Sequence, residues 1–332
     1  MAVNNIAKAG WSVSIRRMAE GMTAFIPVMI GGSLILVLGI NHLYQWANPE
    51  FLATNAMVAA KVGYLNKSFM VVRMLVFGVG AFLFARAIVG NSVKQDKDGL
   101  DSYTHKNVGL SIAYILFFAI SFSLFCVDLL MSLLPTWYST IFGIYCFSGM
   151  FQSSLAFLIL MMLYMKKKGF VQGYYSIEHV HDVAKFMKGF TVFWAYIAFS
   201  QFMLIWYANI PEETEFFLLR FQGGWTAISI ALLVFKFIVP FLALLPRGAK
   251  RNEGHLLLVC LLILVMQFLD IYWLVGPNFN EGHLHFSIYD FGMLALFFGL
   301  LILVMMSFFQ KNGLVAIKDP RMEEALNHHV TY

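Results

Sequence analysis

Runs of about 20 apolar residues recur along the whole chain, separated by short polar segments. A helix needs about 20 residues to cross the ~30 Å hydrocarbon core of a bilayer. The spans are apolar all round and lack strand-like alternation, which argues against a membrane β-barrel. We therefore predict an all-α polytopic membrane protein with eight transmembrane helices, at residues 23–45, 67–90, 107–133, 139–165, 190–209, 224–246, 254–276 and 287–310.

The composition supports a membrane protein without a soluble domain. Only 12% of the residues are Asp, Glu, Lys or Arg, about half the share of a typical soluble domain. Most of the 23 Lys and Arg fall in alternate loops, so the net charge of +5 reflects membrane topology. It does not indicate a nucleic-acid surface. The positive-inside rule then predicts that both termini are cytoplasmic.

The spans divide into two predicted sets of four. We expect the two sets to form two four-helix bundles, with the basic segment between them on the cytoplasmic side. The predicted organisation is an interfacial amphipathic helix at 1–22, a first bundle at 23–165, a cytoplasmic amphipathic loop at 166–189, a second bundle at 190–310 and a cytoplasmic tail at 311–332.

An Asp–Pro spacing occurs once in each half of the chain. Asp128 precedes Pro135, and Asp270 precedes Pro277, by seven residues inside apolar runs. A carboxylate at membrane depth costs roughly 2.5–3.5 kcal/mol or more. The spans before them each carry a basic residue inside the apolar run. This correspondence favours a parallel repeat, although such spacing also arises by chance.

Those basic residues are Arg73 and Lys236. Lys236 lies about 15 Å from either end of its span at 1.5 Å per residue, too deep for its side chain to snorkel to the surface. It must face the bundle interior, pair with an acid or lose its proton. It belongs either to a functional polar path or to a structural ion pair. Arg73 lies nearer the outer end and pairs with either Asp128 or Asp270.

Further polar residues gather where the spans meet the predicted outer surface. Carboxylates and imidazoles at this level hydrogen-bond a quinol or pass protons, or they cap helix ends near interfacial water. Both interpretations stay open. The candidates for a proton path are Asp270, Lys236, Asp128, Arg73 and Asp290. The outer polar cluster consists of His42, Asn209, Glu212, Glu213, His283 and His285.

The sequence predicts no directly bound cofactor. Cys126, Cys146 and Cys260 lie within spans without a CxxC motif, which disfavours zinc, Fe–S and covalent haem sites. No two histidines share one mid-span level, as an axially ligated haem would need. The sequence HxHD, at residues 179–182, is typical of a solvated helix face or, alternatively, a metal site.

Four strings carry a family resemblance. They are DLLMSLLPTWYSTIFGIY (128–145), HDVAKFMKGFTVFWAYIAFSQFMLIWYANIPEET (181–214), KFIVPFLALLPRGAKRN (236–252) and DIYWLVGP (270–277). Together they resemble the ActF subunits of bacterial alternative complex III, relatives of the NrfD/PsrC-type membrane subunits. Asp128, Lys236, Asp270 and residues 209–213 match motif positions. Relatives often carry Trp, an acidic residue and His where Leu129, Leu134 and Thr136 stand here, so the surroundings of Asp128 depart from the family.

The resemblance implies a non-haem subunit of a respiratory quinol:electron acceptor oxidoreductase in a bacterial inner membrane. It implies a quinol-binding sister subunit, an Fe–S subunit and multihaem cytochrome c subunits as partners, and in some assemblies a terminal oxidase. The subunit would scaffold the complex among lipids, as a non-catalytic or proton-conducting component, with menaquinol a candidate ligand. The alternatives are a stand-alone ion or solute transporter and a passive NrfD-like membrane anchor.

Overall fold

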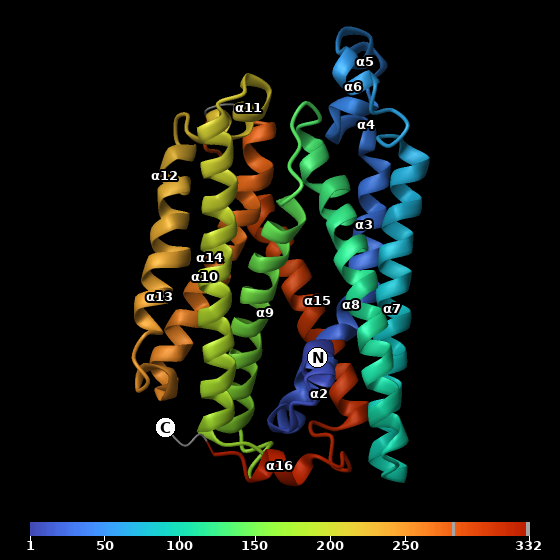
Figure 1. Ribbon diagram of the computed structural model, residues 1–332, viewed down its shortest axis with the longest axis vertical. Helices are drawn as coiled ribbons and strands as arrows, with labels where there is room; N and C mark the ends of the chain where they lie inside the picture. Colours follow the sequence, from blue (N-terminus) through green and yellow to red (C-terminus); the bar gives the residue numbers. More distant parts are fainter. Residues whose placement is uncertain (281–282, 330–332) are drawn as a thin grey trace.

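The computed structural model describes residues 1–280 and 283–329, and in this part of the chain every regular element is helical. Eight segments are long and apolar enough to cross a membrane, which confirms the predicted fold class. The helices run side by side along the long axis of the molecule (Figure 1). The N-terminus and the last helix, α16, lie in its lower half, which we call the terminal side, and α5, α6 and α11 lie on the opposite side (Figure 1).

The eight spans are built from the following helical elements. The first comprises η1 (Gly10–Ser12), α2 (Val13–Met22), η2 (Thr23–Phe25) and α3 (Ile26–Leu38). The others are α7 (Lys67–Asp98), α8 with η4 (Ser102–Leu129, Met131–Leu133), α9 (Phe142–Lys167), α10 (Ile177–Ala208), α12–η5–α13 (Trp225–Ala231, Leu232–Ile238, Val239–Ala243), α14 (Glu253–Val275) and α15 (Ile288–Asn312).

Short helices connect the spans. On the opposite side these are α4 (Ile40–Leu43), η3 (Gln45–Ala47), α5 (Pro49–Thr54), α6 (Ala56–Ala59), α11 (Pro211–Arg220) and η7 (Gly276–Asn278). On the terminal side they are α1 (Ala2–Ile6), η6 (Ala249–Arg251) and α16 (Met322–Leu326).

Local capping makes several helices longer than their apolar runs. Helix α7 continues past residue 90 to Gly99, which ends it with φ +68°, a conformation that suits glycine. Only residues 99–101 separate α7 from α8. Ser176 accepts a backbone hydrogen bond from Glu178 and caps α10. The loop predicted at 166–189 is therefore shorter, because residues 177–189 belong to α10.

The helices form two packed groups. Helix α9 packs mainly against α10 and α14, and the sixth span packs against α10 and α14 as well. In the other group α3, α7 and α8 lie side by side, while α15 contacts α2 and η2. The structure thus joins the fourth span to the second group, whereas the sequence analysis placed it with the first three. Helix α8, next to α9, connects the groups.

The N-terminal segment corrects one prediction. Residues 13–22 are not an exposed interfacial helix, because α2 is buried and packs against α9, α15 and α16. Ile15 and Met18 lie on its buried face, but Arg16, Arg17 and Glu20 are buried too. The ion pairs of these three charged residues, described below, allow them to be buried. Helix α2 is therefore the terminal-side end of the first span.

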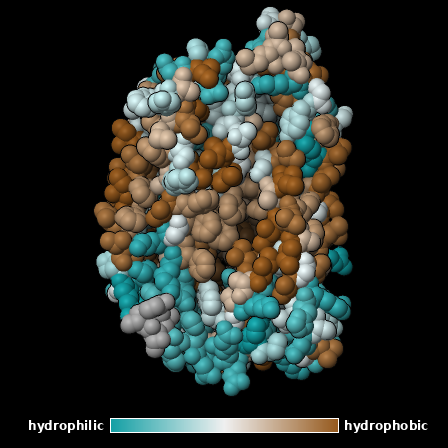
Figure 2. All heavy atoms as spheres, viewed as in Figure 1, coloured by the Kyte–Doolittle hydropathy of each residue, from teal (hydrophilic) through white to brown (hydrophobic). Residues whose placement is uncertain are grey.

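The surface matches the environment that a membrane helix requires. Apolar side chains cover the middle of the face shown in Figure 2, and hydrophilic residues gather at its terminal-side end. Large side chains such as Leu38, Leu258 and Leu303 are more than half exposed. Exposure of this kind would be costly in water but not in lipid. The chain is a multi-pass membrane protein.

Candidate functional site

A kinked sixth span places one lysine inside the second group of helices. Residues 232–238 form a π-helix, η5, and Lys236 lies within it. Pro240 follows four residues later and has no N–H to donate to the Lys236 carbonyl, so the regular α-helical ladder is interrupted there. Gln152 of α9 donates to that carbonyl at 3.5 Å. Interruptions of this kind often mark functional positions.

The Lys236 side chain is completely buried and forms an ion pair with Asp270 of α14. Its Nζ also donates to Gln267 Oε1 at 2.9 Å and lies 4.6 Å from the centre of the Trp194 ring. The Tyr145 hydroxyl donates to the other carboxylate oxygen of Asp270. The ammonium and the carboxylate are therefore both hydrogen-bonded, which a buried charge pair needs to be tolerated.

A glycine on α9 leaves room for this cluster. A Cβ on Gly149 of α9 would lie 2.8 Å from Gln267 Oε1 and 3.3 Å from Lys236 Nζ. A glycine at this position therefore lets α9 approach the charged side chains closely. Next to it, Gln152 donates to Thr191 Oγ1 at 2.9 Å and extends the polar region toward the terminal side.

The polar region ends in apolar packing on the terminal side. Below Thr191 lie the fully buried side chains of Ile159, Met162, Met187 and Cys260. Toward the opposite side, Tyr145 instead lines an aromatic cavity of about 480 Å³. Tyr145 thus joins Asp270 to the cavity on one side, and apolar side chains close off the other side.

A second buried ion pair occupies the first group. Arg73 of α7 forms a bidentate ion pair with Asp128 of α8, in which Nε donates to Oδ2 at 2.7 Å and Nη2 donates to Oδ1 at 2.8 Å. The guanidinium also stacks on Tyr64 and Phe69, at 3.8 and 4.2 Å from the ring centres. Each basic residue therefore pairs with the aspartate of its own half, as a parallel repeat would place them.

Five of the six outer polar residues lie on the surface. His42, Asn209, Glu212, His283 and His285 are exposed. Asn209 ends α10 with φ 47°.

Glu213, the sixth residue of this cluster, and the proton-path candidate Asp290 both have hydrogen-bond partners. The backbone carbonyl of Glu213 accepts a hydrogen bond from Trp137 Nε1 at 3.1 Å. Asp290 accepts the backbone N–H of Ser287 at 2.8 Å and so caps α15. The sequence left open whether these residues take part in quinol or proton chemistry or cap helix ends, and Asp290 caps a helix.

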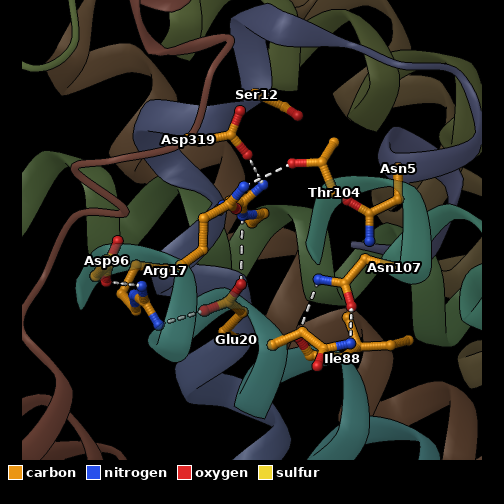
Figure 3. Close-up of polar contacts among 12 residues, drawn as sticks. Asn5, Ser12, Arg17, Glu20, Ile88, Asp96, Thr104, Asn107 and Asp319 are labelled. Carbon is orange, nitrogen blue, oxygen red and sulfur yellow. Dashed lines mark hydrogen bonds and ion pairs between the residues drawn. The ribbon is translucent and has the colours of Figure 1, made fainter. Parts of the chain in front are cut away.

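A charge network on the terminal side was missed by the sequence analysis. Arg17 pairs with Asp96 and with Glu20, the latter at 2.9 Å, and Arg16 pairs with Glu20 at 3.3 Å and Asp319 at 2.5 Å (Figure 3). The network joins the first span, the end of α7 and the C-terminal segment. The signal was present in the sequence, since two arginines and a glutamate precede the first apolar run with helical spacing.

The HxHD sequence is also buried by the C-terminal segment. His179, His181 and Asp182 are 1%, 3% and 6% exposed, so the expected solvated helix face is wrong. His328 and Lys185 each contact Asp182 at 2.7 Å. Across residues 1–280 and 283–329, no group of three or more His, Cys, Asp or Glu side chains could hold a metal ion.

Acid is expected to release the C-terminal segment from α2. Burial opposes ionisation of Asp319, but Arg16 and Arg321 together bring its pKa below the usual value of 3.8. Because the folded pKa is lowered, the stabilisation is present above pH 3.8 and disappears as the pH falls through the folded pKa. A nitroxide on Ile317→Cys, an exposed position, should therefore become mobile only at strongly acidic pH.

The matched control for this experiment is Asp319→Asn. Its label should already be mobile at pH 7, because the neutral amide no longer attracts Arg16. Equal label mobility in both proteins across the whole pH range would contradict this role of Asp319.

No protein-family model matches this sequence, and no curated protein matches it. The class of the protein is therefore defined by its structure. It is a multi-pass helical membrane protein with a buried charge pair in each group of helices.

Proposed function

We propose that the chain is a non-haem membrane subunit of a respiratory quinol:electron acceptor oxidoreductase, and that Lys236 and Asp270 transfer protons within it. The observation that carries the proton-transfer role is the fully buried Lys236–Asp270 pair beside Tyr145 and the aromatic cavity. Membership of the complex is supported by the four strings that resemble the ActF family.

The pair has two protonation states that the site accommodates. As an ion pair, Asp270 accepts from Lys236 and from the Tyr145 hydroxyl. When a proton reaches Asp270, the carboxyl becomes neutral and its attraction for the ammonium weakens. Gln267 and the Trp194 ring remain as partners for the ammonium. The site thus stores one proton without leaving Lys236 unsolvated.

Access to the pair would have to alternate for protons to cross. The apolar side chains around Met187 and Cys260 separate it from the terminal side. The π-helix η5 is the element that carries Lys236 and departs from the regular hydrogen-bond ladder. A shift of η5 would move the ammonium along the bundle axis. With both termini in the cytoplasm of a bacterium, the cavity side faces outward, where a respiratory complex releases protons.

Membership of a complex is tested by purification from native membranes. The resemblance implies that a tagged chain brings with it a quinol-binding sister subunit, an Fe–S subunit and multihaem cytochromes. The preparation is expected to show c-type haem absorbance although this chain supplies no haem ligand pair. A tagged protein that elutes alone, without haem absorbance, would contradict the proposal. Ion flux through the isolated chain in liposomes would then support a transporter.

A further inference from the structure

Three lysines lie close together where α10 meets the turn after the sixth span, on the terminal side. Helix α10 packs against α13 and η6 there (Figure 1). Lys185 and Lys188 lie three residues apart on one face of α10, and Lys250 belongs to η6. Burial lowers the pKa of the Lys250 ammonium below its usual value, and the positive charges of Lys188 and Lys185 lower it further. The three like charges repel one another, so an anion among them would relieve the repulsion.

The Lys188 ammonium has hydrogen-bond donors to spare. It lies 5.6 Å from the centre of the Phe241 ring, and it makes no hydrogen bond or ion pair within the part of the chain that the structure describes. Lys250, in contrast, donates to the three backbone carbonyls of residues 244–246 at 2.8–3.1 Å, which occupies its three donors. Lys250 therefore contributes charge to this place, whereas Lys188 contributes both charge and donors.

The neighbouring carboxylates do not cancel this charge. Asp182 of α10 pairs with Lys185 at 2.7 Å. Glu178, one turn earlier, pairs with Arg251 of η6 at 2.5 Å. Each of these carboxylates is matched by one cation, and the charges of the other two lysines remain unbalanced. The site therefore attracts an anion.

An exposed apolar surface begins directly beside the lysines. Val192 and Tyr196 follow Lys188 at intervals of four residues, so they lie on the same face of α10, and both are exposed. Across from them, Leu242 and Leu245 at the end of the sixth span are exposed as well. Ammonium groups at such a boundary reach the phosphate level of a bilayer, and the apolar side chains next to them meet acyl chains.

We propose that this face binds one anionic phospholipid, with its phosphate at Lys188 and Lys185 and an acyl chain along Val192 and Tyr196. The phosphate oxygens accept hydrogen bonds from Lys188 Nζ, and Lys250 stabilises their charge from within the turn. The proposal goes beyond the proposed function, because it concerns a site in the isolated chain.

The test measures, by native mass spectrometry, how many phospholipids bind to the full chain in dodecyl maltoside micelles. The probes are dioleoylphosphatidylglycerol and dioleoylphosphatidylcholine, which share their chains and their phosphate but differ in net charge. The first phosphatidylglycerol is expected to bind at least about fivefold more tightly, the contribution of one lysine at an anionic surface. Glycerophosphoglycerol, which is the same head without chains, should not displace it, because the apolar contacts are missing.

Lys188→Gln is expected to weaken the binding of phosphatidylglycerol about fivefold. The matched control is Lys106→Gln on α8. Lys106 directly precedes the apolar run predicted at 107–133, and its ammonium lies 5.7 Å from the centre of the Tyr103 ring. The control therefore removes the same charge from a similar setting outside the three-lysine site, and it should bind like the unchanged chain.

Lys185→Gln removes another charge from the site and is expected to weaken binding as well, so it decides the matter if Lys188→Gln does not fold. Equal affinity for the two lipids in the unchanged chain would overturn the proposal. Equal weakening by Lys188→Gln and Lys106→Gln would also overturn it, since the lipid would then respond to the total charge of the terminal side. Displacement by glycerophosphoglycerol would show that a soluble anion suffices, which contradicts a lipid site.

Failure of this test is distinct from failure of the proposed function. Co-purification with c-type haem does not depend on this lysine cluster, and lipid binding by the isolated chain does not depend on partner subunits.

Discussion

Replacing Lys236 with methionine is expected to destabilise the protein by about 3–5 kcal/mol, the usual cost of removing one partner from a buried ion pair. Methionine fills a similar volume, so the packing around Trp194 and Gly149 is largely kept. The Asp270 carboxylate, 2% exposed, would lose its counter-ion and keep only the Tyr145 hydroxyl bond. The measurement is the free energy of unfolding in mixed detergent and denaturing-detergent micelles.

Replacing both partners separates the pair's net contribution from the cost of an orphaned charge. The double variant Lys236→Met with Asp270→Leu is expected to recover most of the stability lost in the single variant, because apolar replacements of a buried pair are often neutral. The comparison needs both single variants and the double variant in one thermodynamic cycle. If the double variant is as unstable as the sum of the singles, the two side chains are not coupled.

Arg73→Leu is expected to have a comparable effect, again about 3–5 kcal/mol. Arg73 donates hydrogen bonds to both carboxylate oxygens of Asp128 and to the backbone carbonyl of Tyr64, the last at 3.1 Å. Leucine would leave Asp128, 1% exposed, with no counter-ion, and would also remove the guanidinium stacked on Tyr64 and Phe69. Unfolding measured as above checks the value.

Arg73→Lys is the informative companion to that variant. Lysine keeps the charge but loses the two-pronged geometry and the planar stacking, so it should recover only part of the stability. Full recovery by lysine would show that charge alone, without the fork, holds Asp128. An unchanged stability in Arg73→Leu would contradict the pair's structural role.

The sequence predicted the charged sites better than it predicted the helix ends. Lys236 was expected to face the bundle interior, pair with an acid or lose its proton, because its side chain is too short to reach either surface. The structure pairs it with Asp270. Arg73 was left with two candidate partners. Asp128 is its partner because α7 and α8 pack against each other in the first group.

The terminal side was predicted less well, for a physical reason. Charged residues near an apolar run are usually assigned to the membrane surface, since burying them alone is costly. Arg16 and Arg17 are buried because Glu20, Asp96 and Asp319 neutralise them. Asp96 and Asp319 come from distant parts of the chain, and local pattern does not reveal such pairings.

The grouping of the helices was also not predicted correctly, because local sequence pattern does not reveal which helices pack together. Hydropathy finds spans but contains no information on which apolar faces meet, since lipid and protein interior are equally apolar. The fourth span joined the second group through side chains such as Tyr145 and Gln152, which bond to partners on α14, α10 and η5.

The proposed role of Lys236 and Asp270 in proton transfer is tested most directly by the number of protons translocated per electron. The measurement uses the purified complex in proteoliposomes, with the Lys236→Met and Asp270→Leu double variant beside Arg73→Leu with Asp128→Leu. We expect the first double variant to assemble and oxidise quinol while translocating fewer protons per electron. The second should leave that ratio unchanged. An unchanged ratio in the first variant would contradict the proposal and leave the pair a structural one.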